Sequence, residues 1–130
     1  KERAHELRAQ KSRAGGEADV LAKISEMRDS DRAMAARLHA IVTSAAPGLV
    51  PKTWYGMPAY ANAEGKVVCF FRSGQMDKTR YSTFGFSVQA ELDSPDGFWP
   101  TSYALQDPSE KAWERLGELV KRAARTTNSD

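Results

Sequence analysis

The spacing of apolar residues changes twice along this chain, and that change constrains the fold more than any other feature. Apolar residues recur at helical spacing up to Ala45, alternate along short segments between residues 51 and 105, and return to helical spacing after Asp107-Pro108. Helices, then strands, then a helix, joined by short turns, predict an antiparallel sheet, because parallel strands need crossovers of about a dozen residues or more. The predicted fold class is α+β, with a small antiparallel sheet packed against N- and C-terminal helices.

Local signals place the individual elements. Residues 17–27 predict a short amphipathic helix, and a long core helix is expected after MRDSD, where Asp29 or Ser30 can cap it. The predicted strands are residues 52–55, 59–62, 66–71, 80–86 and 101–105. In the strand 66–71, Val67, Cys69 and Phe71 are expected on one face and Val68 and Phe70 on the other. Both faces are then apolar, so this strand is predicted to be central.

The N-terminal residues 1–14 have a helix-forming composition, but Leu7 is their only large apolar residue. Such a helix has nothing to bury in a core. Gly15-Gly16 is expected to end it, because glycine disfavours a helix interior by about 1 kcal/mol relative to alanine. The predicted organisation is therefore an exposed helical extension over residues 1–16 and a single domain over residues 17–126.

The composition argues against several classes of protein. With 130 residues, of which 41% are hydrophobic and 28% charged, the chain has the size of one domain. No apolar run approaches the ~18 residues of a membrane helix. The first residues form no secretory signal and Cys69 has no disulfide partner in the chain, so the cytoplasm is the expected compartment. A net charge of only +2 makes nucleic acid an unexpected partner.

The familiar catalytic and metal motifs are not found in the sequence. It contains no P-loop, G-x-G-x-x-G, G-x-S-x-G or H-E-x-x-H pattern. Cys69 lies mid-strand between apolar neighbours, which favours a buried structural thiol over a nucleophile. His5 and His39 lack the spacing of a metal-binding pair. We therefore predict no catalytic residues, and the residues themselves predict no cofactor.

The stretch KTWYGMPAY, residues 52–60, is the most aromatic part of the chain. Gly56 permits a positive φ or a close backbone approach and Pro58 withholds an N–H, so a bent strand at a sheet edge is expected. Its aromatic rings either fill the core or line a pocket. In the pocket hypothesis they meet Trp99 and a basic residue in a cleft for a small anionic or planar ligand. The candidate ligand-binding residues are Tyr55, Gly56, Met57, Pro58, Tyr60, Arg72, Arg80 and Trp99.

Four stretches give the chain a resemblance to a known family. In chain order they are KTWYGMPAYA, GKVVCFF, KTRYSTFGFS and FWPTSYAL, and the motif Tyr55-Gly56-Met57-Pro58 is fairly specific. Over about residues 17–125 the chain resembles the YdhG-like family, also called the domain of unknown function 1801, and especially its actinobacterial type. The resemblance implies a compact α+β fold. One branch of the family is described as frataxin-like iron chaperones that deliver iron for cluster and haem assembly, so iron is the cofactor that the resemblance implies.

These expectations favour a cytoplasmic, non-enzymatic domain that binds a small ligand or serves a protein partner as an accessory protein. A frataxin-like iron donor is the first alternative. Its candidate metal ligands are Glu26 and Asp29, since carboxylate oxygens are hard ligands suited to iron. An enzyme with an unrecognised site is the second alternative.

Overall fold

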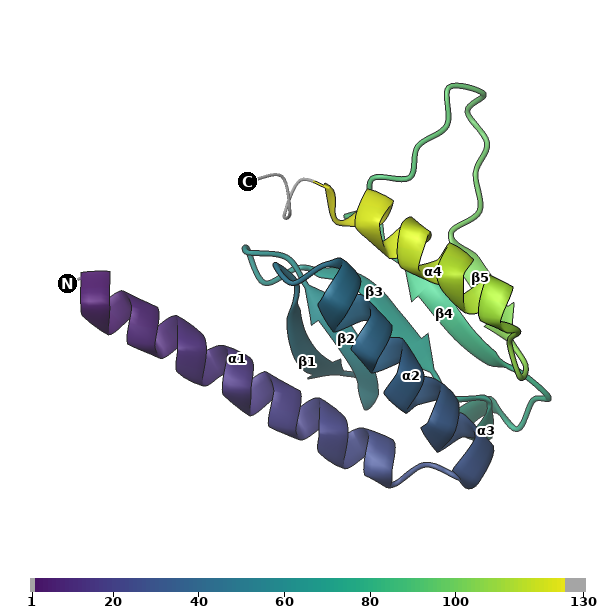
Figure 1. The fold of residues 1–130 in the computed structure, drawn as a ribbon, viewed down its shortest axis with the longest axis horizontal. Coiled ribbons are helices and arrows are strands. Elements are labelled where there is room, and N and C mark those ends of the chain that lie inside the picture. Colours follow the sequence, from purple (N-terminus) through teal and green to yellow (C-terminus); the bar gives the residue numbers. More distant parts are fainter. Residues whose placement is uncertain (1, 126–130) are drawn as a thin grey trace.

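A computed structural model describes residues 2–125 of the chain, with side chains from residue 11 onward. In chain order the elements are α1 (Glu2–Ser25), α2 (Asp29–Ala45), β1 (Val50–Trp54), β2 (Met57–Ala61), β3 (Val67–Arg72), α3 (Gly74–Asp77), β4 (Ser82–Phe86), β5 (Ser102–Leu105) and α4 (Glu110–Ala123). The strands form one antiparallel sheet in the order β1-β2-β3-β4-β5. Helices α2 and α4 lie side by side across one face of it (Figure 1). The predicted α+β fold is confirmed.

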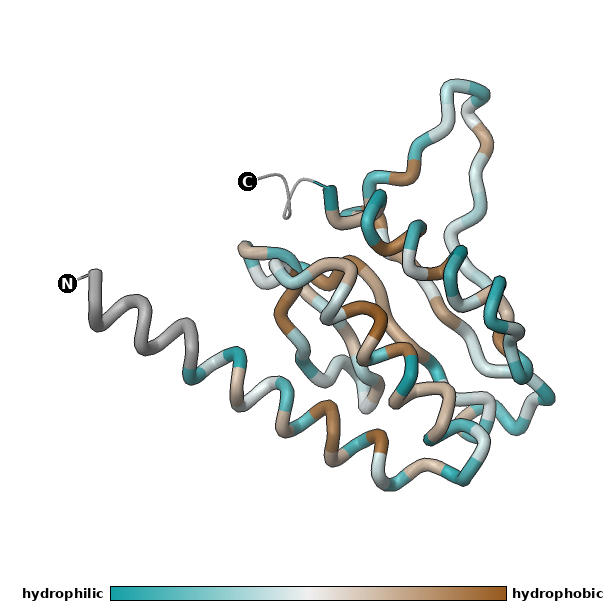
Figure 2. Tube along the Cα trace, in the orientation of Figure 1, coloured by the Kyte–Doolittle hydropathy of each residue, from teal (hydrophilic) through white to brown (hydrophobic). Residues whose placement is uncertain are grey.

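The hydrophobic core lies between this face of the sheet and the long helices. Its largest members from the helices are Val20, Ile24, Met34, Leu38, Val42, Trp113, Leu116 and Val120. From the sheet come Tyr60, Phe71 and Phe84, each with no exposed surface. Burying a side chain of this size stabilises the fold by about 1.5–3 kcal/mol. Figure 2 shows apolar residues in the C-terminal part of α1, where Val20 and Ile24 reach the core.

The expected helix break at Gly15-Gly16 is wrong, because α1 runs without interruption from Glu2 to Ser25. Gly16 lies against β1, where an added Cβ would come within 2.0 Å of the Pro51 carbonyl oxygen. Arg13 Nη1 also donates to the Leu49 carbonyl oxygen at 2.9 Å. These tertiary contacts outweigh the weak helix propensity of glycine. The division into residues 1–16 and 17–126 stays a prediction, and residues 1 and 126 lie outside the described residues.

The KTWYGMPAY stretch forms a tight hairpin rather than the expected bent edge strand. Trp54 pairs with Met57, so Tyr55 and Gly56 are the two turn residues. Their φ angles are +52° and +77°, and two positive φ angles characterise the type I′ turn that suits right-twisted hairpins. The positive φ expected of Gly56 is confirmed, but Pro58 lies in β2, between β1 and β3. The edge strand on this side is β1, which α1 covers.

The strand β3 is central, as predicted, but its alternation is interrupted. Tyr60 pairs with Cys69 whereas the next residue of β2 pairs with Val67, so the register shifts at this point. Val68 consequently joins Cys69 in the core cluster, against the predicted alternation. Phe70 packs elsewhere: its ring covers Gly85 of β4 and lies near the ring of Trp54.

Candidate functional site

The three aromatic residues of the predicted cleft lie in different environments. Tyr60 has no exposed surface, and its hydroxyl lies 2.9 Å from His39 Nδ1. Tyr55 is 81% exposed at the hairpin tip, and Trp99 is 36% exposed in the segment that precedes β5. Tyr60 therefore belongs to the core, and the pocket hypothesis is wrong for this residue.

Arg72, Met57 and Pro58 serve the fold where the structure places them. Arg72 forms a bidentate ion pair with Asp77, with Nε–Oδ2 and Nη2–Oδ1 both at 2.7 Å. This pairing lowers the pKa of Asp77 from its ordinary value and raises the pKa of Arg72. Arg72 Nη1 also lies 3.8 Å from the sulfur of Met57, which is buried, as is Pro58. The Arg72 guanidinium thus fastens β3 to α3.

Three hydrogen-bonded side chains, Glu17, His39 and Tyr60, form a network that runs from the partly exposed Glu17 into the core, which the sequence pattern did not indicate. His39 of α2 is 7% exposed and places Nε2 at 2.9 Å from Glu17 Oε2 of α1, while its Nδ1 faces Tyr60. Burial raises the pKa of Tyr60 and of the nearby Cys69 thiol, so both stay protonated at neutral pH. The hydrogen bonds of His39 to Glu17 and Tyr60 therefore hold α1, α2 and β2 together. The predicted buried, structural Cys69 is confirmed as buried.

A polar cavity of about 350 Å³ lies between the start of α2 and the segment that joins α3 to β4. Its lining includes Arg28, Ser30, Asp31, Lys78, Thr79 and Arg80. We call it the basic pocket, because three of these side chains are cationic. Arg80 is the member of the predicted ligand-binding set that lies in it.

The cations of the basic pocket are not neutralised by neighbouring acids. Among the described residues, no carboxylate lies within ion-pair distance of Arg28, Lys78 or Arg80. The Arg80 guanidinium instead lies 5.3 Å from the centre of the Tyr81 ring. Among the described residues none accepts a hydrogen bond from the Arg80 guanidinium, so its N–H groups are available to a ligand.

The one carboxylate in the pocket lining, that of Asp31, already accepts hydrogen bonds from neighbouring residues. Asp31 Oδ2 accepts from Ser73 Oγ at 2.5 Å and from the Gln75 N–H at 3.2 Å. Asp31 Oδ1 lies 3.4 Å from Ser82 Oγ. These contacts hold the carboxylate against the wall formed by α3 and β4, so the pocket keeps an excess of positive charge.

The backbone around the basic pocket adds two features. The expected cap by Asp29 or Ser30 is wrong: α2 has Arg28 at its N-cap and no side chain caps it. The first turn of a helix carries N–H groups without intrahelical partners, which favour negative charge. Lys78 ends α3 in the left-handed conformation with φ +55°. This conformation is strained for a residue other than glycine, and such strain often marks functional sites.

A second cavity, of about 320 Å³, adjoins the first at Gln75, which lines both. Lys23, Glu26, Met27, Gly56, Ser73 and Met76 complete its lining, and we call it the methionine pocket. Its Glu26, a candidate iron ligand, lies 3.5 Å from the ammonium group of Lys23.

The second candidate iron ligand, Asp29, is paired with Arg32 at 2.6 Å. Within the part of the chain that the structure describes, no group of three or more His, Cys, Asp or Glu side chains is placed to hold a metal ion. The described helices also include none that is long and apolar enough to cross a membrane.

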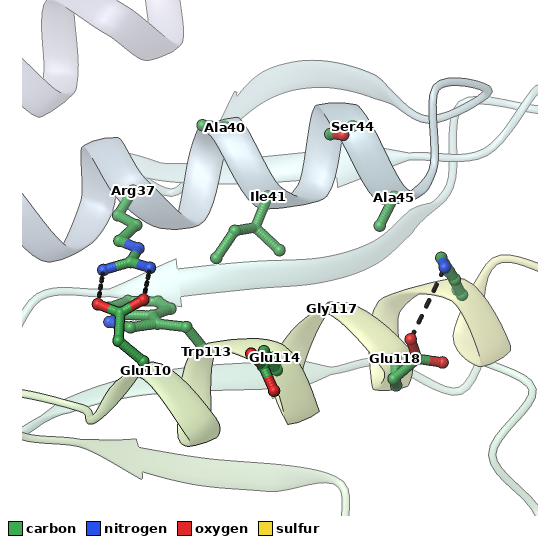
Figure 3. A pocket seen from close by; sticks show the side chains of 11 residues that line it. Arg37, Ala40, Ile41, Ser44, Ala45, Glu110, Trp113, Glu114, Gly117 and Glu118 are labelled. Carbon is green, nitrogen blue, oxygen red and sulfur yellow. Dashed lines mark hydrogen bonds and ion pairs between the residues drawn. The ribbon is translucent and has the colours of Figure 1, made fainter.

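A third cavity is a groove of about 550 Å³ between α2 and α4 (Figure 3). Ile41, Ala45 and Trp113 give it an apolar floor. Both of its cationic residues are paired: Arg37 with Glu110, at 2.7 and 2.5 Å, and Lys121 with Glu118, at 3.7 Å. The groove therefore offers no free cation, in contrast to the basic pocket.

Comparisons of the chain with family models, with curated proteins and with solved structures gave no match.

Proposed function

We propose that this chain is a non-enzymatic binding domain for a small anionic ligand, and that the basic pocket is the binding site. The observation that carries the proposal is the convergence of Arg28, Lys78 and Arg80 on one cavity, without an ion-pair partner among the described residues. Unpaired cations around a cavity are the usual means of holding a phosphate or carboxylate group.

The features of the site suit a phosphate group best. Arginine presents a planar fork of donors that matches phosphate oxygens, and lysine adds a mobile point charge. Ser30 also lines the cavity, whereas the Thr79 hydroxyl already donates to the Tyr81 carbonyl oxygen at 2.9 Å. The N–H groups of the first turn of α2 add partial positive charge, which Asp29 and Asp31 in the same turn partly offset. Two arginines, a lysine and a helix start supply more positive charge than a single carboxylate ligand needs.

The raised pKa values of two potentially reactive side chains, Cys69 and Tyr60, support a ligand-binding role without catalysis. Cys69 and Tyr60 are the two residues with the strongest upward shifts of pKa, and burial causes both shifts. A reactive thiolate needs partial exposure and a pKa near or below neutral pH. Neither residue lines the basic pocket. These groups stabilise the core, so a ligand in the basic pocket meets donors and charges but no activated nucleophile among them.

The proposal includes a family and a compartment. We place the chain in the YdhG-like family, on the support of the motif Tyr55-Gly56-Met57-Pro58 and of the α+β fold. We place it in the cytoplasm because Cys69 has no disulfide partner in the chain. The iron donor and the enzyme with an unrecognised site remain its alternatives. An iron site at Glu26 or Asp29 would have to break the pairs with Lys23 and Arg32.

Calorimetric titration with inorganic phosphate at low ionic strength tests the proposal. We expect saturable binding that weakens as salt is added, because exposed charges are screened. Arg80→Gln should weaken binding about ten-fold or more, since a hydrogen bond to a charged group contributes about 1.5–3 kcal/mol. Arg37→Gln is the matched control, because it removes the same charge from the groove. Equal losses in both variants, or no binding to the native chain, would overturn the proposal.

An anaerobic titration with Fe(II) tests the iron-donor alternative on the same protein. Micromolar, saturable binding that disappears in the Glu26→Gln, Asp29→Asn double variant would favour the iron donor. If phosphate binds and Fe(II) does not, the anion site is favoured.

A further inference from the structure

The basic pocket and the methionine pocket share one lining residue, Gln75. Gln75 Oε1 accepts from the Arg28 N–H at 2.9 Å. The Gln75 N–H points to Ser73 Oγ at 3.1 Å and to Asp31 Oδ2 at 3.2 Å. Gln75 is therefore held at both its amide group and its backbone, and the two cavities keep a fixed relation on either side of it.

The methionine pocket has a different chemistry from its neighbour. Met76 of α3 is 47% exposed and Met27 is half-buried, so two thioether side chains border the cavity. Methionine is flexible and polarisable, and it adapts to apolar groups of varied shape. The two charged residues of the lining, Lys23 and Glu26, are paired with each other. The cavity thus offers apolar contact and no unpaired charge among its described lining residues.

The hairpin tip keeps one side of the methionine pocket open. Gly56 lines the cavity, and a Cβ built on it would meet no heavy atom within 4 Å. Its φ of +77° is favourable for glycine and strained for other residues. The tip therefore leaves room beside Met27 and Met76 for a group of a ligand, which the hairpin does not fill with its own side chain.

From this juxtaposition we infer that the ligand is a small phosphate monoester with an apolar body, such as an aryl group. The phosphate lies between Arg28, Lys78 and Arg80, and the apolar body crosses Gln75 to lie against Met27 and Met76. This inference rests on the proposed anion site and specifies the ligand class that the site takes. In pockets with an apolar lining and few polar groups, the apolar lining usually supplies the affinity and the polar groups fix the orientation of the ligand.

Calorimetry with three probes, inorganic phosphate, phenyl phosphate and phenol, tests the inference on the full chain. Phenyl phosphate should bind about ten-fold tighter than phosphate, which corresponds to about 1.4 kcal/mol, and phenol should bind far more weakly than either. Because apolar contacts are not screened by salt, the ratio of the two phosphate affinities should persist as salt is raised.

Two variants locate the apolar contact. Met76→Gln should abolish the advantage of phenyl phosphate and leave the affinity for inorganic phosphate unchanged. Leu21→Gln is the matched control, because Leu21 is also 47% exposed and lines neither cavity. This control should retain the full ratio of affinities.

The outcomes separate the inference from the proposed function. Equal affinities for phosphate and phenyl phosphate, or an advantage that survives in Met76→Gln, would overturn the inference and leave the anion site standing. No binding of either phosphate would overturn both. Phenol binding as tight as phenyl phosphate would overturn the inference alone, since the phosphate group would then contribute nothing to the binding of this ligand.

Discussion

The groove between α2 and α4 and the basic pocket are both rimmed by charged side chains, yet only one of them retains positive charge for a ligand. In the groove, Arg37 meets Glu110 across the two helices and Lys121 meets Glu118 within α4 (Figure 3). In the basic pocket none of the three cations has such a partner among the described residues. The two cavities thus differ in the pairing of their cations and in their charge balance, since acids outnumber cations in the groove and cations outnumber acids in the basic pocket.

The difference arises from where the neighbouring acids are used. Three aspartates lie in the segments that form the basic pocket, and each has another partner. Asp29 pairs with Arg32, Asp77 pairs with Arg72, and Asp31 accepts from Ser73. The carboxylates stabilise α2, α3 and β3, and so the cations that line the cavity are left without an ion-pair partner among the described residues. In the groove, by contrast, both cations pair with acids of the groove itself, Glu110 and Glu118, and a third acid, Glu114, also lines it.

The largest expected effect is structural and lies in the groove. Trp113 is 5% exposed on the groove floor, beneath the guanidinium of Arg37 at 5.4 Å from the ring centre. Trp113→Ala should lower the free energy of unfolding by about 3–5 kcal/mol, because it removes buried apolar surface and leaves a cavity. Urea unfolding measures this loss. Phosphate affinity of the folded variant should not change, and a loss below about 1 kcal/mol would show that the groove floor is not core.

The next effect separates binding from stability at Lys78. Lys78→Gly should weaken phosphate binding about ten-fold through loss of a charge. It should also raise the free energy of unfolding by about 1 kcal/mol, because glycine adopts the left-handed conformation without strain. Lys78→Gln is the control: it loses the same charge and keeps the strain. If both variants bind phosphate as the native chain does, Lys78 is not part of the site.

A smaller, purely stabilising effect is expected at Gly117 in α4. A Cβ at this position would lie 3.5 Å from Ile41 Cγ2, which is an ordinary van der Waals contact. Gly117→Ala should therefore stabilise the protein by about 1 kcal/mol through helix propensity, and partly fill the groove without affecting phosphate binding. Thermal unfolding checks the first expectation and calorimetry the second. Altered phosphate affinity would mean that the groove takes part in binding.

The smallest expected effect is the pH dependence of the groove's ion pair. Hydrogen bonding to Arg37 lowers the pKa of Glu110 from its ordinary value of 4.5. The stability that the pair contributes is therefore present above pH 4.5 and is lost as the pH falls through the lower pKa of the folded state. Unfolding curves across this range should show the loss in the native chain, and Arg37→Gln should reduce it. An unchanged acid profile in the variant would assign the loss to other carboxylates.

The fold could be predicted from the sequence because it depends on periodicity, which is a local property. The helical spacing before Ala45 and the alternation after residue 51 are sufficient for an antiparallel α+β arrangement. The continuity of α1 could not be predicted, because it depends on the contact between Gly16 and Pro51, which are 35 positions apart. Tyr60 was predicted in a ligand-binding cleft but lies in the core for a similar reason, because its hydrogen-bond partner His39 is on another element.

The candidate site was predicted only in part, and again for a physical reason. Arg80 was identified as a basic residue near aromatic ones, and Lys78 stands in the same sequence segment. Arg28 joins them from a segment about fifty positions earlier, through the hydrogen bonds that Arg28 and Asp31 form with Gln75. A sequence shows how many charges a segment carries, but only the fold decides which of them are paired. Arg72 and Arg80 look alike in the sequence, yet Arg72 is neutralised by Asp77.

A titration of the isotope-labelled protein with inorganic phosphate, followed by backbone amide NMR, tests the central claim most directly. The amide signals of Ser30, Gln75, Lys78 and Thr79, which line the basic pocket, should shift together and saturate with the calorimetric affinity. The amides of Ala40, Ser44 and Gly117, which line the groove, should stay in place. Shifts centred on the groove, or small shifts spread over all exposed cationic residues, would contradict the claim that unpaired charge in the basic pocket makes it the binding site.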